Sequence, residues 1–176
     1  GAAMQIHQML TQPQLLVYAS VLKPRRPVHV LGAEFQFIHT PKKCFFGITN
    51  HWATKESQVK VSDLEKTVID GLRQPEYCGG LSEVAKGLWM RHQDMNPARL
   101  IEYAKKTGIS AVIRRLGFLM ELYKIGAAQG LEALQNTLTE TYMRLDPRLP
   151  AEGKFLRRWR LQLNVSQEEL LTVVRT

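Results

Sequence analysis

The spacing of apolar residues changes twice along this chain of 176 residues, and that change constrains the fold more than any other feature. Between about residues 61 and 138, apolar side chains recur every three or four positions, which is the period of amphipathic helices. In residues 14–48 and 155–164 the pattern is closer to the period of two that strands show. This order predicts an α+β fold, in which a small, mostly antiparallel sheet packs against a bundle of about five helices.

The expected strands lie at both ends of this pattern. Near the N-terminus, apolar residues within 15–18, 28–30, 35–37 and 44–48 are separated by turn-forming residues such as Gly32. We expect these segments to pair in one small sheet.

A late strand is predicted over residues 159–164. Trp159 and two leucines fall on one side of its alternation, while Arg158 and Arg160 fall on the other. This strand could rejoin the first sheet, which would leave both arginines on an exposed sheet face.

Polar residues and glycines mark where the helices begin and end. Ser62 and Glu65 form a capping-box pattern, because the hydroxyl of the first can accept a hydrogen bond from the backbone N–H of the second. Asn96-Pro97 is a typical helix start, and Gly108 and Gly126 are typical helix ends. The predicted helices span about residues 61–74, 81–91, 97–107, 109–125 and 131–138, and a second capping box at Ser166 and Glu169 opens a short terminal helix.

The charge of the chain is unevenly distributed. Lys and Arg number 24 against 16 Asp and Glu, a formal net charge of +8. The excess lies in residues 1–60, with seven basic and two acidic side chains, and in residues 142–176, with seven and four. A basic surface attracts phosphate polyanions, so nucleic acid is the first partner to consider. The alternative is a protein that is basic without contacting nucleic acid.

Motifs that would carry chemistry are absent from the sequence. It has no phosphate-binding P-loop and no nucleophile elbow, and Cys44 and Cys78 lie in unrelated contexts. Glu65, Lys66 and Asp70 share one predicted helix, where a cap and an i,i+4 ion pair explain them better than a paired-carboxylate site. We therefore expect no enzyme activity, no cofactor and no metal site. The histidines that would have to supply metal ligands sit in separate segments: His7, His29, His39, His51 and His92.

Localisation is predicted from two further absences. The sequence shows no signal peptide and no run of 18 apolar residues, so we expect a cytoplasmic protein. Gly1, Ala2 and Ala3 look like residues left by cloning ahead of Met4, and residues 1–13 are expected to be a tag or the remnant of a preceding segment.

Clusters of basic residues are the candidates for contact with a nucleic acid or a protein partner. They could bind phosphates or an acidic protein surface, or they could be solvated side chains that discourage aggregation of sheet edges. The candidates are Arg25, Arg26, Lys42, Lys43, Arg114, Arg115, Arg157, Arg158 and Arg160.

Four segments, in order, resemble the AbiEi family of antitoxins from bacterial abortive-infection systems. Residues 61–72, VSDLEKTVIDGL, are similar to that family's s-x-x-E-[KR]-T-x-x-D-x-[LI] helix, and the GGLSEV of residues 79–84 follows at the right distance. RRLGFLME, residues 114–121, resembles its R-R-L-G-[YF]-L-x-E helix. RLDP, residues 144–147, and WRLQLN, residues 159–164, resemble its closing L-D-P and W-x-[LV]-x-[VLI]-N patterns. The matched signature residues are Glu65, Lys66, Thr67, Asp70, Arg115, Gly117, Glu121, Asp146, Pro147, Trp159 and Asn164.

The resemblance implies an antitoxin domain, residues 14–176, that counteracts a nucleotidyltransferase toxin of a type IV toxin–antitoxin pair without necessarily forming a stable complex with it. The winged helix that binds operator DNA in this family has no counterpart in the sequence. Many signature residues are expected to hold the fold: Gly117 by permitting close helix packing, Asp146-Pro147 as a turn, and Trp159 in the core.

The first hypothesis is therefore an antitoxin that acts by binding or regulation rather than by catalysis. The second is a transcriptional-regulator module that binds DNA or tRNA. A third is an enzyme that reverses the toxin's modification or acts on the toxin itself.

Overall fold

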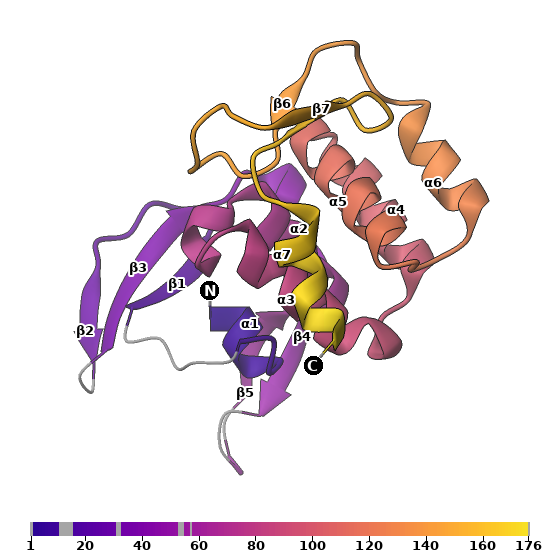
Figure 1. Ribbon diagram of the computed structural model, residues 1–176. Helices are drawn as coiled ribbons and strands as arrows, with labels where there is room; N and C mark the ends of the chain where they lie inside the picture. The colour runs from indigo at the N-terminus through magenta and orange to yellow at the C-terminus, as the bar shows by residue number, and fades with distance from the viewer. Residues whose placement is uncertain (1, 11–15, 31–32, 53–54, 57, 176) are drawn as a thin grey trace.

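The computed structural model describes residues 2–10, 16–30, 33–52, 55–56 and 58–175 (Figure 1). The fold is α+β: helices form the body of the molecule, and three small sheets lie around it. Among the described residues, no helix combines the length and the apolar character needed to span a lipid bilayer.

Five helices make the body, as the apolar period predicts. The second helix of the chain lies at its centre and packs against the three that follow it. Its inward stripe includes Val68, Ile69 and Leu72, all fully buried. The five helices are α2 (Leu64–Arg73), α3 (Leu81–Arg91), α4 (Pro97–Thr107), α5 (Ser110–Leu122) and α6 (Ala128–Gln135).

Three helices differ at their ends from the sequence-based prediction, and one of them is α6, which was expected over about 131–138. The N-cap of α2 is Asp63, whose carboxylate accepts a hydrogen bond from the backbone N–H of Lys66 at 2.7 Å, so the predicted capping box of Ser62 and Glu65 is wrong. Helix α5 ends at Leu122 rather than near Ile125. The other caps are confirmed: Asn96 caps α4, and Ser166 caps α7 (Gln167–Leu171).

The first sheet has the strand order β1-β3-β2, with β1 (Leu16–Val21), β2 (Val28–Val30) and β3 (Ala33–His39). Strand β2 is antiparallel to β3, whereas β1 is parallel to it. Leu15 and Gly32, a predicted strand residue and a predicted turn, lie outside the described residues.

The strand predicted at residues 44–48 is wrong. Residues Lys42–Cys44 form a short 3₁₀ helix, and a strand begins only at Ile48. This strand, β4 (Ile48–Trp52), pairs with β5 (Gln58–Ser62) in a separate antiparallel sheet.

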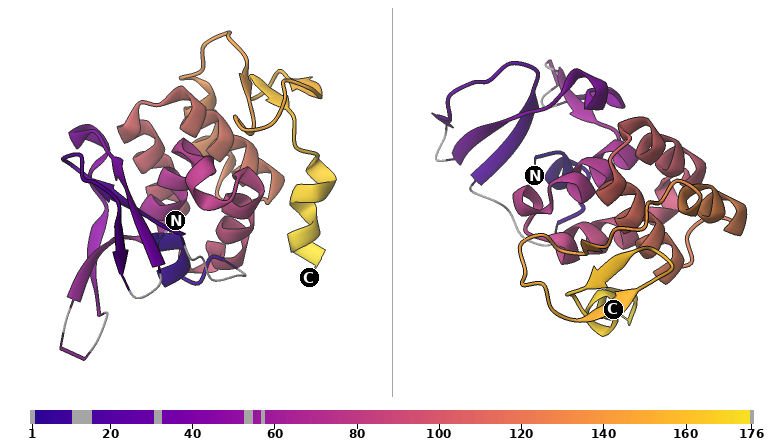
Figure 2. Two further views of the ribbon diagram at one scale, coloured as in Figure 1. Left: turned by 90° about the vertical axis from the view of Figure 1, so that its left-hand side faces the viewer. Right: turned by 90° about the horizontal axis from the view of Figure 1, so that it is seen from above.

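The C-terminal strands form a third sheet instead of rejoining the first. Its order is β6-β8-β7, with β6 (Met143–Arg144), β7 (Lys154–Leu156) and β8 (Leu161–Leu163). The predicted strand over 159–164 is therefore too long, because residues 157–160 form the turn between β7 and β8. Figure 2 shows this sheet and the first sheet on different sides of the helices.

The described residues near the N-terminus belong to the same folded unit. Helix α1 (Ala2–Ile6) packs on α2, and both Met4 and Met9 are buried in the core. Close contact is possible because Gly87 of α3 has no side chain; a Cβ there would lie 3.0 Å from the Cβ of Met9. Met4 and Met9 thus pack with the core although they precede residue 14, the predicted start of the domain. The described residues also form four 3₁₀ helices: η1 (Lys42–Cys44), η2 (Pro75–Cys78), η3 (His92–Asp94) and η4 (Thr172–Arg175).

Candidate functional site

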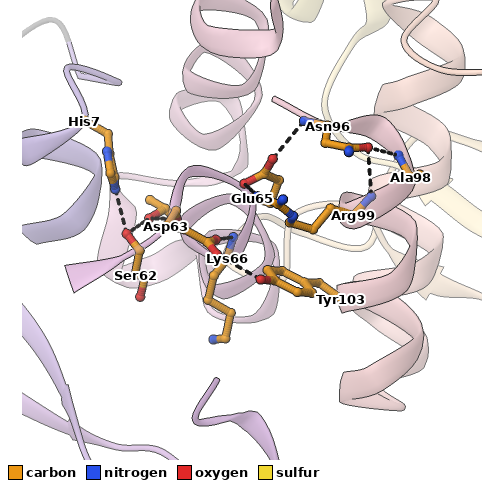
Figure 3. A network of polar contacts seen from close by, with 10 residues as sticks. His7, Ser62, Asp63, Glu65, Lys66, Asn96, Ala98, Arg99 and Tyr103 are labelled. Atoms are coloured by element: carbon orange, nitrogen blue, oxygen red, sulfur yellow. Dashed lines mark hydrogen bonds and ion pairs between the residues drawn. The ribbon is translucent and has the colours of Figure 1, made fainter. Parts of the chain in front are cut away.

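The signature residues on α2 tie this helix to α4 (Figure 3). Glu65 accepts a hydrogen bond from the backbone N–H of Asn96 at 2.8 Å and lies 3.7 Å from the guanidinium of Arg99. The Tyr103 hydroxyl donates to the Asp63 carboxylate at 2.9 Å. Burial, together with this bond to a carboxylate, raises the pKa of Tyr103 to about 12. All these contacts stay within the protein, so Glu65 has a structural role.

Lys66 and Thr67 have structural partners too. The Lys66 side chain is 2% exposed and forms the predicted i,i+4 ion pair with Asp70, while its Nζ lies 5.0 Å from the ring centre of Phe46. The Thr67 hydroxyl donates to the backbone carbonyl of Asp63 at 2.7 Å.

Arg114 and Arg115 are buried, and their side chains donate hydrogen bonds to backbone carbonyls within the protein, although Arg115 also borders a surface hollow. This finding corrects their place among the predicted contact residues. Arg114 donates to backbone carbonyls of Thr139, Thr141 and Arg160. Burial lowers its pKa, and the nearby charge of Arg160 adds to the effect.

Arg115 joins two parts of the chain. Its guanidinium donates to the carbonyl of Leu72 in the last turn of α2 at 2.7 Å, and to the carbonyl of Leu145 at 2.9 Å. The end of α2 thereby gains a cation beside carbonyls that no helical N–H satisfies. Burial lowers the pKa of Arg115, and Asp146 and Glu76 oppose that shift.

Trp159 fills the core, as predicted, and fixes the turn that carries two of the candidate arginines. Its indole N–H donates to Glu121 at 2.6 Å. A Cβ on Gly117 would lie 2.0 Å from the Trp159 ring, so this glycine makes room for an indole rather than for another helix. Arg158 lies beside Trp159 and pairs with the other oxygen of Glu121 at 2.5 Å.

Asp146 and Asn164 fix the C-terminal segment on α3. Asp146 is buried and accepts a hydrogen bond from the backbone N–H of Leu81, the first residue of α3, at 3.0 Å. Asn164 exchanges hydrogen bonds with the backbone of Asp146 at 2.9 and 2.7 Å. Asp146 and Pro147 lie in the predicted turn.

The remaining basic candidates fall into two separate groups. Arg25 and Arg26 lie exposed between β1 and β2, and Lys42 and Lys43 lie exposed in η1. Arg157, Arg158 and Arg160 lie in the turn beside β8, not on a strand face as predicted. Because the first and third sheets occupy different sides of the helices, the structure does not bring the two groups together (Figure 2).

The outer face of the third sheet carries a row of polar and aromatic side chains. Arg144 on β6 and Phe155 on β7 are both register partners of Gln162 on β8, so the three side chains share one face. The opposite face is apolar, since Leu161 is fully buried.

Two further residues extend this row. The Tyr142 ring packs edge-on against the Phe155 ring, with centroids 5.1 Å apart and planes at 84°. The Arg160 guanidinium lies over the Tyr142 ring, 5.7 Å from its centre. We call Tyr142, Arg144, Phe155, Arg160 and Gln162 the C-terminal platform.

The platform borders a hollow of about 360 Å³. Phe155 is 63% exposed and Tyr142 39%, although aromatic side chains are usually buried. Sequence analysis did not single out Tyr142, Arg144 or Phe155 as contact residues, because they meet only through the pairing of β6 and β7 with β8. The hollow is lined by Arg115, Tyr142, Met143, Arg144, Pro147, Phe155 and Gln162.

A second cavity, of about 410 Å³, lies between the N-terminal strands and α2. Its walls are largely apolar and include Tyr18, Phe35 and Ile38, with Asp70 and Arg73 at their edge. In the part of the chain that the structure describes, no three His, Cys, Asp or Glu side chains lie close enough together to hold a metal ion.

Comparison of the chain with protein-family models, with curated proteins and with solved structures gave no match.

Proposed function

We propose that the chain is an antitoxin domain that counteracts a nucleotidyltransferase toxin, and that it acts through the C-terminal platform by binding rather than by catalysis. Two kinds of evidence support this function. One is the AbiEi-like order of motifs in the sequence. The other, which carries the proposal, is the exposure of aromatic rings and guanidinium groups side by side on the third sheet.

The signature residues support the proposal indirectly. Arg115, Asp146 and Trp159 hold the C-terminal segment against the helices through buried or part-buried hydrogen bonds, and Asn164 braces Asp146 within that segment. These signature residues hold the platform in position but do not belong to it. The residues free to meet a partner are then those of the platform itself and the neighbouring Arg157.

Rescue of growth tests the function. The chain would be co-expressed with a candidate nucleotidyltransferase toxin from the same genome, and colony counts compared with those of cells that express the toxin alone. Growth is the readout because neutralisation need not require a stable complex. We expect rescue by the natural chain and its loss in the double variant Arg144→Glu/Arg160→Glu.

The matched control is Arg25→Glu/Arg26→Glu, which changes the net charge equally on another side of the molecule and should retain rescue. Circular dichroism and thermal unfolding would establish that each variant is folded. Absence of rescue by the folded natural chain would refute the function, and loss of rescue in both double variants would refute the role of the platform.

A further inference from the structure

We propose that the hollow at the C-terminal platform binds one unstacked base of a single-stranded nucleic acid, with the phosphates on either side held by the platform arginines. This inference rests on the proposed function in that it identifies the partner of the same surface. Single-stranded nucleic acids are bound where aromatic rings offer stacking faces beside a positively charged path for the backbone.

The geometry of the rings suits a base. Tyr142 and Phe155 stand nearly perpendicular to one another, and Phe155, which is 63% exposed, keeps accessible ring surface on which a third planar group could stack. A hollow of about 360 Å³ falls in the range of small-ligand sites, roughly 300–1,000 Å³, and is large enough for a nucleobase. The Gln162 amide in its wall can both donate and accept hydrogen bonds, as the edge of a base requires.

The backbone holds Arg160 in place for this role. Its φ of 51° is in the left-handed region, which residues other than glycine rarely adopt. Its carbonyl accepts hydrogen bonds from the backbone N–H of Met143 at 3.1 Å and from Arg114 at 2.9 Å. Two bonds from buried or paired groups therefore fix the turn that lays the Arg160 guanidinium over Tyr142.

Charge favours a nucleic acid over a protein at this surface. Arg144 is exposed in the wall of the hollow, and the half-buried Arg160 lies over the ring of Tyr142, which also lines it. Of the acids near the platform, Asp146 accepts a hydrogen bond from the backbone N–H of Leu81 and Glu121 pairs with Arg158, while Glu140 and Glu152 are exposed. Within residues 142–162, six basic side chains outnumber two acidic ones, and this excess favours a polyanion because guanidinium groups hold phosphates well.

The test measures binding of fluorescently labelled 12-nucleotide single strands, one of RNA and one of DNA with the same sequence, by anisotropy at several salt concentrations. Binding of either strand, tighter than binding of the matching duplex, is expected because a duplex keeps its bases stacked. Phe155→Ala and Phe155→Leu should each weaken binding roughly 5- to 100-fold, with no change in the salt dependence.

The charge variants should behave differently. Arg144→Gln and Arg160→Gln should each lower the slope of log affinity against log salt by about 0.7, the value for one phosphate contact on a single strand. The control is Trp52→Ala, which removes an equally exposed aromatic ring (61%) from β4 and should leave binding unchanged. Because Phe155 is exposed, its replacement should leave the unfolding temperature unchanged.

Three results would overturn the inference: no binding of either strand at low salt, equal binding of duplex and single strands, or unchanged binding by both Phe155 variants. The growth assay separates this inference from the proposed function, since it needs no added nucleic acid. Rescue of growth by a chain that binds neither strand would leave the antitoxin function standing with a protein as its partner, and the base-binding site refuted.

Discussion

Buried arginines at neighbouring positions of α5 hold two sides of the molecule together. Arg114 reaches the carbonyls that precede β6, and Arg115 reaches the end of α2. Both were predicted at the surface, because arginine is seldom fully buried in proteins. The exception has a physical cause. Backbone carbonyls of irregular segments have no N–H partner within a helix or sheet, and a guanidinium group, which has five N–H donors, can donate hydrogen bonds to several of them at once. No pattern in the sequence of α5 could reveal those carbonyls.

The substitution Arg115→Met tests this role. It keeps much of the side-chain volume but leaves the carbonyls of Leu72 and Leu145 buried without a donor, so we expect a loss of about 2–4 kcal/mol in the free energy of unfolding. Urea unfolding followed by circular dichroism measures the loss. Arg157→Met, at an exposed position, should change the free energy by less than about 0.5 kcal/mol. Equal midpoints for the two variants would contradict the role of Arg115.

Helices and sheets differ in how far the sequence could predict them. The helix starts at Leu81 and Pro97 agree with the predictions, because caps and glycine stops act within one turn of the helix that they delimit. The sheets depend on pairing between distant residues. The parallel pairing of β1 with β3, and the turn that shortens the predicted strand at residues 159–164, have no local signal.

The start of α2 gives a test at the level of a single helix. Asp63→Ala removes the N-cap acceptor and the partner of the Tyr103 hydroxyl, so it should lower the free energy of unfolding by about 1–2 kcal/mol. Ser62→Ala, one residue earlier, removes the hydroxyl of the predicted capping box and should have an effect below about 0.5 kcal/mol. Chemical denaturation of both variants decides between the two caps, and a larger loss for Ser62→Ala would restore the capping box.

The contact between α5 and α7 predicts a dependence of stability on pH. Tyr123 follows the last residue of α5, is buried, and donates its hydroxyl to the carbonyl of Leu170 at 2.9 Å. Burial raises its pKa from 10.0 to about 12. The folded state then holds this proton more tightly than the unfolded state, so the contribution is complete below pH 10 and is lost as the pH rises towards 12.

The expected loss from Tyr123 between pH 9 and pH 12 is at most about 3 kcal/mol, since one pKa unit corresponds to about 1.4 kcal/mol. Urea unfolding of the natural protein and of Tyr123→Phe would be compared at the two pH values. The variant has no hydroxyl proton to lose at this position, so its free energy of unfolding should decrease less between the two pH values, by the amount given above. Parallel pH profiles for the two proteins would contradict a raised pKa.

At the scale of the whole molecule, the platform forms where two separate parts of the C-terminal segment come together in the third sheet. Tyr142 and Phe155 are 13 positions apart and meet because β6 and β7 flank β8. The fold class follows from the apolar period alone, whereas this site requires the strand order, the turn at Arg160 and the buried arginines together. For that reason the sequence could indicate the basic charge of the C-terminal region but not the aromatic residues among it.

The opposite end of the chain supplies the last test of how the molecule is assembled. Met4 and Met9 are fully buried, and His7 lies 2.6 Å from the carbonyl of Ser62 at the end of β5. Replacing a buried methionine with alanine costs about 2–5 kcal/mol, against a total stability of about 5–15 kcal/mol for a typical domain. The double variant Met4→Ala/Met9→Ala should therefore lower the unfolding temperature sharply or leave the chain unfolded. Gln5→Ala, at an exposed position on the same helix, should leave the unfolding temperature within a few degrees of the natural value. If both variants unfold at the natural temperature, the N-terminal residues lie outside the core and the domain starts where β1 begins.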